Sequence, residues 1–110
     1  MAKKKLSKKI TVQVQRYIAI LKKDKLPIQK ILVYGSYAKG TPHKWSDIDV
    51  CVVSSKFKNT WSAIEYLWAQ RLFDKHYTIE PIGFSVKDFS SSSPLIDEIK
   101  NTGIEVDLSL

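Results

Sequence analysis

Residues 33–53 read VYGSYAKGTPHKWSDIDVCVV, and this stretch indicates more about the chain than any other. It opens with an apolar run that Gly35 closes, and it ends with a second apolar run that begins at Asp47. Short β-branched runs bounded by glycine and polar residues predict buried strands, here over residues 30–35 and 47–53. The residues between the two runs are small, polar and basic, which suits a loop that receives negative charge.

Asp47 and Asp49 are the most informative pair in this stretch. Side chains two positions apart on a strand point to the same face, with their Cα atoms roughly 6.5–7 Å apart. Two carboxylates held this close repel each other unless a cation lies between them. Magnesium prefers a few carboxylates combined with phosphate oxygens of a substrate. The pair therefore predicts a magnesium site at the beginning of the second strand.

Gly35 and Ser36 form a turn between the first strand and a short stretch that can become helical. A glycine here lets the backbone approach a ligand closely, and free N–H groups at a helix start point toward anions such as phosphate. The Ser36 hydroxyl adds a donor. Lys39 and Lys44 are either solvated or neutralise phosphate, and in the second interpretation all four residues belong to a binding site.

The order of these features resembles the signature of the DNA polymerase β-like nucleotidyltransferase superfamily. The signature is G-S, about ten residues, and then D-x-D before an apolar strand, and the sequence here is GSYAKGTPHKWSDIDVCVV. The sequence is most similar to the minimal nucleotidyltransferases, which include antitoxin partners of HEPN-type toxins. The resemblance covers the chain from about residue 10 to the end. It implies that Gly35 and Ser36 hold the terminal phosphates of a nucleotide and that Asp47 and Asp49 ligate magnesium.

The resemblance also implies a third carboxylate from a later strand, as a metal ligand or as the base that deprotonates the acceptor. Glu80 is the predicted residue, because it lies on the strand expected over residues 77–86. Glu105 and Asp107, on the last expected strand, are the alternatives. Many relatives place Asp where Glu80 stands, and few follow it with a proline such as Pro81. An altered or inactive site is therefore an open alternative.

Two longer helices are expected outside the central stretch. Residues 8–25 carry apolar side chains at helical spacing and a lysine-rich outer face, and Pro27 ends this helix. Asn59 is the expected N-cap of a helix over residues 60–75. That helix carries large apolar side chains along one face, which predicts core or interface contacts: Trp61, Ile64, Trp68 and Leu72.

The remaining elements complete an α/β chain. Pro81 places the third strand, residues 77–86, beside an edge or weakens its middle. A last helix ends before Gly103, and residues 104–110 read as a fourth strand. The order α, β, β, α, β, α, β predicts an α/β fold with a small mixed sheet flanked by helices, because the β–β step excludes a uniformly parallel sheet. The resemblance implies that this is the polymerase β-like nucleotidyltransferase fold.

Composition bounds the class of protein. The 110 residues are 44% hydrophobic and 26% charged, which is typical of one globular domain. We expect a basic flexible tail over residues 1–7 and a single nucleotidyltransferase domain over residues 8–110. The chain has one cysteine, Cys51, which excludes an internal disulfide and indicates a reducing compartment. No apolar run reaches the roughly 18 residues of a membrane span, and no export signal is evident, so a cytoplasmic protein is expected.

The net charge of +7 comes from one end of the chain. Residues 1–30 carry ten Lys or Arg against one acid, whereas residues 31–110 carry eight bases against ten acids. A solvated lysine tail explains this distribution. Nucleic-acid binding through the basic N-terminus is the alternative, and it predicts binding that weakens steeply with salt.

The leading hypothesis is a magnesium-dependent nucleotidyltransferase that moves a nucleoside monophosphate, AMP from ATP, onto a hydroxyl of an unknown acceptor. ATP or another NTP is the substrate, and Asp47, Asp49 and Glu80 hold two Mg²⁺ ions. The alternative is an antitoxin-type binding module that neutralises a HEPN-like helical protein, with catalysis secondary or lost. The expected partners are accordingly a nucleoside triphosphate and a HEPN-like protein. Acceptor, nucleotide preference and oligomeric state stay open.

Overall fold

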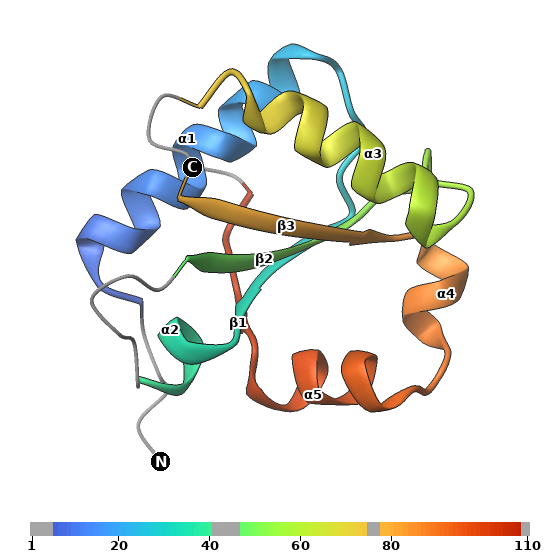
Figure 1. Cartoon of the computed structure of the whole chain (residues 1–110). Helices are drawn as coiled ribbons and strands as arrows, with labels where there is room; N and C mark the ends of the chain where they lie inside the picture. The colour runs from blue at the N-terminus through green and yellow to red at the C-terminus, as the bar shows by residue number, and fades with distance from the viewer. Residues whose placement is uncertain (1–5, 41–46, 75–77, 109–110) are drawn as a thin grey trace.

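A computed structural model describes residues 6–40, 47–74 and 78–108 (Figure 1). Within these residues four strands form one sheet in the order β3-β2-β1-β4. β1 is antiparallel to β2 and to β4, whereas β2 is parallel to β3. The strands are β1 (Lys30–Tyr34), β2 (Ile48–Val53), β3 (Ile79–Phe84) and β4 (Ile104–Glu105). The predicted mixed sheet is confirmed.

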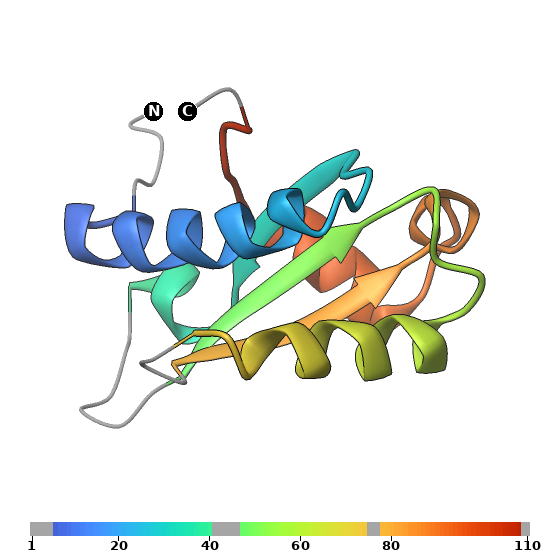
Figure 2. The same cartoon turned by 90° about the horizontal axis from the view of Figure 1, so that it is seen from above.

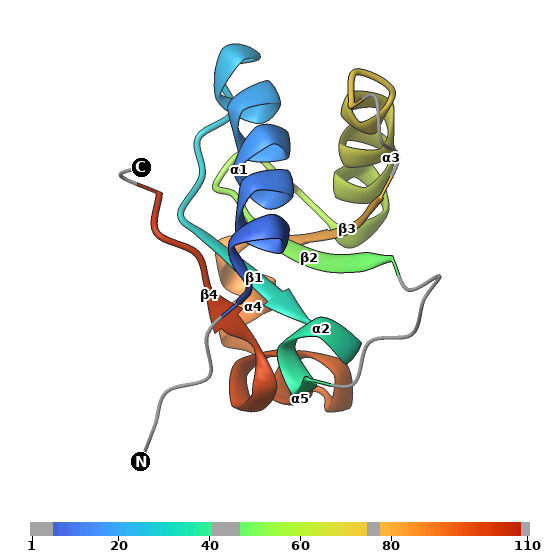
Figure 3. The same ribbon diagram turned by 90° about the vertical axis from the view of Figure 1, so that its left-hand side faces the viewer.

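Helices cover both faces of the sheet. α1 (Lys8–Lys23) and α3 (Thr60–Arg71) lie side by side on one face, as Figures 2 and 3 show. α4 (Val86–Ser90) and α5 (Pro94–Thr102) lie on the other face, with the single turn α2 (Ser36–Lys39) directly after β1. The predicted arrangement of helices around a small sheet is confirmed. None of the helices in the described ranges has the length and hydropathy of a membrane span.

The sheet separates two apolar clusters because side chains alternate along each strand. On the α1 and α3 side, Ile48, Val50 and Val52 of β2 are buried together with the apolar face of α1. On the α4 and α5 side, Cys51 and Val53 are buried with the apolar side chains of α4 and α5. The alternation predicted for this strand is therefore observed.

Capping residues define both long helices. The Ser7 side chain accepts a hydrogen bond from the Ile10 backbone N–H at the start of α1, and Leu6 packs against the core. Asn59 caps α3 as predicted by accepting from the Ser62 N–H at 2.8 Å. α3 ends at Arg71, earlier than the predicted residue 75.

α3 turns a different face to the core from the predicted one. Its buried residues are Ala63 and Leu67, whereas Trp61 is 72% exposed and Leu72 70% exposed. The cause is the close approach of α3 to β3: a Cβ on Gly83 would lie 2.8 Å from both the Ala63 and the Leu67 side chain. Bulky indoles do not fit a contact this tight, so the core interpretation of Trp61 is wrong and the interface interpretation stays open.

β3 is an edge strand, and Pro81 fits it for that reason. The Thr78 and Phe84 carbonyls accept bonds from β2 and the residue after it. Residues of the other parity, Pro81 among them, therefore direct their backbone groups to the open edge, where a missing N–H removes no ladder bond. The Arg71 Nε donates to the Ile79 carbonyl at 2.6 Å on this same edge. The prediction that Pro81 lies beside an edge is confirmed.

Candidate active site

Three side chains form a row across the sheet. Tyr34 on β1 pairs with Asp49 on β2, and Asp49 pairs with Glu80 on β3. Neighbouring strands lie about 4.8 Å apart, and residues at facing positions point to the same face. Asp47 directly precedes β2, two positions before Asp49 and therefore on the same side of the chain. The structure thus brings the three predicted carboxylates to one end of β2 and β3.

The electrostatics of this row centre on Asp49. Asp49 is partly buried, whereas Asp47 and Glu80 are exposed. Burial, followed by the negative charges of Glu80 and Asp47, raises the pKa of Asp49 to about 6. A cation at this position would favour the ionised carboxylate and offset the repulsion. The row is therefore a place where positive charge is stabilised.

The donor set fits magnesium in its chemistry. Carboxylate oxygens are the hard ligands that this ion takes. In the described part of the chain, however, no group of three His, Cys, Asp or Glu side chains is already arranged to hold a metal ion. Magnesium commonly binds through one or two carboxylates together with phosphate oxygens and water, so an incomplete protein cage suits it when a nucleotide supplies the other ligands.

Gly35 lies directly against the Asp49 carboxylate. Its φ of +73° is in the left-handed region, and a Cβ at this position would lie 2.1 Å from Asp49 Oδ2. Any other residue would be strained and would collide with the carboxylate. Gly35 is also the N-cap of α2, and its carbonyl accepts a bond from the Lys39 N–H at 3.0 Å. The backbone at Gly35 therefore lies directly against Asp49, with the half-buried Ser36 next in the chain.

Of the two lysines predicted for the phosphate site, the structure describes Lys39. Lys39 Nζ forms an ion pair with Glu98 Oε1 of α5 at 2.8 Å, and both side chains are close to half exposed. Pairs as exposed as this contribute about 0–1 kcal/mol, so a phosphate can replace Glu98 at small cost. Lys44 lies outside the described residues.

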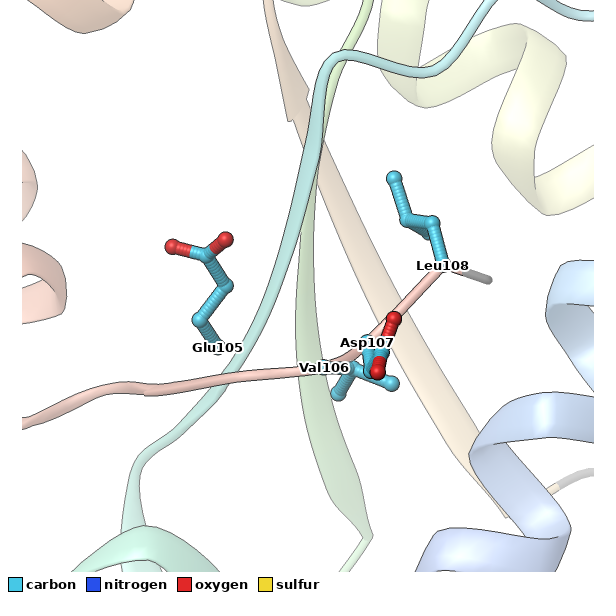
Figure 4. A pocket seen from close by; sticks show the side chains of 4 residues that line it. All are labelled: Glu105, Val106, Asp107 and Leu108. Carbon is cyan, nitrogen blue, oxygen red and sulfur yellow. The ribbon is translucent and has the colours of Figure 1, made fainter. Parts of the chain in front are cut away.

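Glu105 and Asp107, the alternatives for the third carboxylate, lie elsewhere. β4 is paired to the side of β1 that faces away from β2, where Glu105 faces Leu32. Glu105 Oε1 is 3.6 Å from Lys30 Nζ. Both acids line a hollow near the end of the described chain, together with Val106 and Leu108 (Figure 4). Glu80 is thus the candidate that stands next to Asp49.

Tyr34 and Glu98 belong to the surroundings of the site and were missed from the sequence. Burial, followed by the negative charge of Asp49, raises the pKa of Tyr34 above its ordinary value, so its phenol stays protonated. The position of Tyr34 directly before Gly35, at the end of a strand, could have indicated that it lies near the site. The sequence around Glu98 carries no such indication, because the role of Glu98 depends on how α5 packs beneath α2.

Cys51 stands two positions after Asp49 on the same face of β2. It is fully buried, and burial raises the pKa of its thiol to about 12. A thiol that stays protonated is a poor nucleophile. The surroundings of Cys51 therefore do not support a nucleophilic role.

Solved structures with the same fold include three toxin–antitoxin complexes. A chain of a toxin–antitoxin complex with AMP-PNP is 22% identical over 88% of this chain and 72% of that chain, with a TM-score of 0.55. A mutant of the pair MntA–HpeT gives 19% identity over 84% and 71%, with a TM-score of 0.59. The tri-AMPylated HEPN toxin of Shewanella oneidensis in complex with MNT antitoxin gives 19% over 87% and 70%, with a TM-score of 0.51. At these identities the likeness shows the fold alone.

The family follows from the sequence match rather than from these structures. Among curated proteins no match is found. Residues 14–109, which include every described member of the row, match the model of the nucleotidyltransferase domain. The chain belongs to the nucleotidyltransferase domain family.

Proposed function

We propose that the chain transfers a nucleoside monophosphate, AMP from ATP, onto a hydroxyl of a protein, using Asp47, Asp49 and Glu80 to hold magnesium. The observation that carries the proposal is the register that sets Asp49 beside Glu80, with Gly35 against the Asp49 carboxylate. In a member of the nucleotidyltransferase family, this arrangement supplies both a cation site and a backbone turn that nucleotide phosphates can approach.

The residues of the chain divide the work by their positions. The turn at Gly35 and Ser36 holds the terminal phosphates through backbone N–H groups and the serine hydroxyl. Bound magnesium would supply charge stabilisation at the attacking and leaving oxygens. Lys39, once released from Glu98, adds positive charge beside the phosphates. Each of these contributions serves positioning and electrostatics, which account for most catalysis of phosphoryl and nucleotidyl transfer.

The transfer itself is a displacement at the α-phosphorus. The acceptor oxygen forms a bond to this phosphorus, the bond to the oxygen of the leaving pyrophosphate breaks, and the hydroxyl proton passes to a carboxylate. Glu80 suits that last role because it is exposed on the edge strand, where an acceptor can reach it.

A HEPN-like helical protein is the proposed acceptor. Support comes from two structural neighbours, a toxin–antitoxin complex with AMP-PNP and a tri-AMPylated HEPN toxin in complex with its antitoxin. A second candidate function is neutralisation of such a protein by binding alone. The exposed Trp61 and Leu72 of α3, which a partner protein would cover, favour this alternative.

The test is incubation with magnesium, ATP labelled on its α-phosphate, and the purified HEPN-like proteins of the same genome. Asp47→Asn and Asp49→Asn should lower label transfer by about a hundredfold or more while circular dichroism stays unchanged. Glu105→Gln is the matched control, since it removes an acid outside the row, and should transfer normally. Full activity in either Asn variant would end the proposal. If the Asp47→Asn variant still neutralises the HEPN-like protein, the binding module is favoured.

A further inference from the structure

Large apolar side chains stand exposed on α3 and directly after it. We name them the α3 stripe: Trp61 is 72% exposed, Trp68 38%, Leu72 70% and Phe73 71%. Trp61, Trp68 and Leu72 share one helix face, opposite the buried Ala63 and Leu67. Together the stripe exposes on the order of 500 Å² of apolar surface, which reaches the size of patches that mark interaction sites.

The stripe leads to the carboxylate row. α3 packs along β3, and at its end Arg71 Nε bonds the Ile79 carbonyl at 2.6 Å, one residue before Glu80. Leu72 and Phe73 follow Arg71 immediately, so this end of the stripe lies at the end of β3 that carries Glu80. The stripe lies on the α1 and α3 side of the sheet and the row on the α4 and α5 side, so a protein bound along the stripe would reach the row around the sheet edge at β3.

The helix beside the stripe is strongly basic. α1 and α3 lie side by side (Figure 3). The Tyr17 hydroxyl of α1 donates to the Leu67 carbonyl of α3 at 2.7 Å, and the Tyr66 hydroxyl of α3 donates at 2.5 Å to Oδ2 of Asp24, which follows α1. The charged residues of α1 are all bases, and all are exposed: Lys8, Lys9, Arg16, Lys22 and Lys23. Charge complementarity therefore favours a partner with acidic residues flanking its apolar surface.

The same charges disfavour two other occupants. In a two-fold antiparallel pairing of two α3 helices, the α1 helices of both copies would lie on the same side and set their bases against each other. A nucleic acid would meet the exposed carboxylate of Glu65, which lies between Trp61 and Trp68 on the stripe face. Leu72, moreover, offers no aromatic ring for a base to stack on.

We propose that the α3 stripe docks a helical protein whose surface is apolar at its centre and acidic on the side that meets α1. Residues 61, 65, 68 and 72 follow the four-three-four spacing with which one helix packs against another. The inference rests on the proposed function in taking this protein to be the acceptor. Docking on α3 would hold the acceptor beside the β3 edge, around which its hydroxyl has to extend to meet the carboxylate row.

The test measures binding of the purified, nuclease-treated HEPN-like proteins of the same genome by biolayer interferometry. Trp61→Glu and Leu72→Glu should each weaken binding about tenfold or more, and their high exposure leaves the fold intact. Val86→Glu, on the 47% exposed Val86 of α4, is the matched control and should bind normally. Asp47→Asn should also bind normally. Lys9→Glu with Arg16→Glu should slow association and weaken its salt dependence.

The outcomes separate docking from catalysis. Normal binding by Trp61→Glu and Leu72→Glu, or no binding by the wild type, overturns the docking surface, whereas label transfer that depends on Asp47 would leave the proposed function standing. Binding that depends on the stripe, without label transfer, would overturn the proposed transfer and support the docking surface. The docking inference is also overturned if the stripe substitutions instead abolish binding of a mixed-sequence RNA. It is likewise overturned if, in analytical ultracentrifugation, the wild type is a dimer and the stripe variants are monomers.

Discussion

The face of the sheet beneath α4 and α5 has two halves with opposite chemistry. In the covered half, Cys51 and Phe84 are buried against α4 and α5. In the open half, Asp49 lies two positions before Cys51 on β2 and stands in a row with Tyr34 and Glu80. Burial raises the pKa of the Cys51 thiol to about 12, so it stays neutral, whereas the pKa of Asp49 is raised only to about 6. Along a single strand, helix cover buries the thiol completely and leaves the carboxyl group partly exposed.

The difference teaches how the site is positioned. The covered half supplies rigid packing that holds β1, β2 and β3 in register, and the open half uses that register to set three side chains side by side. Functional groups at the uncovered end of a packed scaffold keep access to ligands while their backbone stays fixed. Variants that damage one half and spare the other can therefore test the division.

The largest effect is expected from the covered half. Ile99 of α5 is fully buried, and Ile99→Ala should lower the free energy of unfolding by about 2–5 kcal/mol because it leaves a cavity. Leu95→Ala on the same helix, where Leu95 is 40% exposed, should cost less than about 1 kcal/mol. Urea denaturation measures both. Equal losses in the two variants would show that α5 does not pack as described.

Gly35→Ala should damage the open half with less effect on the fold. Its Cβ would collide with Asp49 Oδ2, and a displaced carboxylate should lower transfer by about a hundredfold. Gly40 is a matched control, because it has a φ of +76° but its Cβ would meet nothing within 4 Å. Gly40→Ala should therefore lose about 1 kcal/mol of stability and keep most of its activity. Similar activity in both variants would argue against the role of the Asp49 contact.

Local sequence patterns predicted much of this arrangement. The alternation along residues 47–53 assigned Asp47 and Asp49 to one face, and the glycine after the first strand marked the turn that abuts Asp49. The signature motif then implied the nucleotidyltransferase family. These features depend on neighbours in the chain, which is why a sequence reveals them.

Features that depend on distant contacts were not predictable in the same way. The row of Tyr34, Asp49 and Glu80 arises from strand register, and the Lys39 to Glu98 pair arises from α5 packing near α2. The error at Trp61 has the same origin. α3 carries apolar residues on two faces, and only the close approach of Gly83 selects the face with the smaller side chains.

The titration of Asp49 offers a test of intermediate size. Its pKa is raised from 3.8 to about 6 in the folded chain, so the stability that this group contributes is complete below about pH 4 and is lost as the pH rises through 6. The charges that face it are those of Glu80 and Asp47, and the Tyr34 phenol is neutral throughout. Because Asp49 is partly exposed, the loss is discounted to about 1 kcal/mol.

Unfolding free energies in EDTA at pH 4 and pH 7.5 measure this effect. Between pH 4 and pH 7.5 the wild type should lose about 1 kcal/mol more unfolding free energy than Asp49→Asn, since the amide does not ionise. Carboxylates remote from Asp49 titrate alike in both proteins and cancel in the difference. A variant that follows the wild type at every pH would place Asp49 in an environment without the described repulsion.

The smallest effects are expected from two exposed ion pairs, one beside the open half and one away from it. Lys39 pairs with Glu98 at 2.8 Å beside the open half, and Lys30 pairs with Glu105 at 3.6 Å away from it. Both pairs are exposed, so Lys39→Ala and Lys30→Ala should each change stability by less than about 1 kcal/mol. Only Lys39→Ala should raise the KM for ATP, by about threefold to tenfold, because only this ammonium can exchange its carboxylate for phosphate. If Lys30→Ala raises KM equally, the effect belongs to net charge rather than to the position of Lys39 beside Gly35.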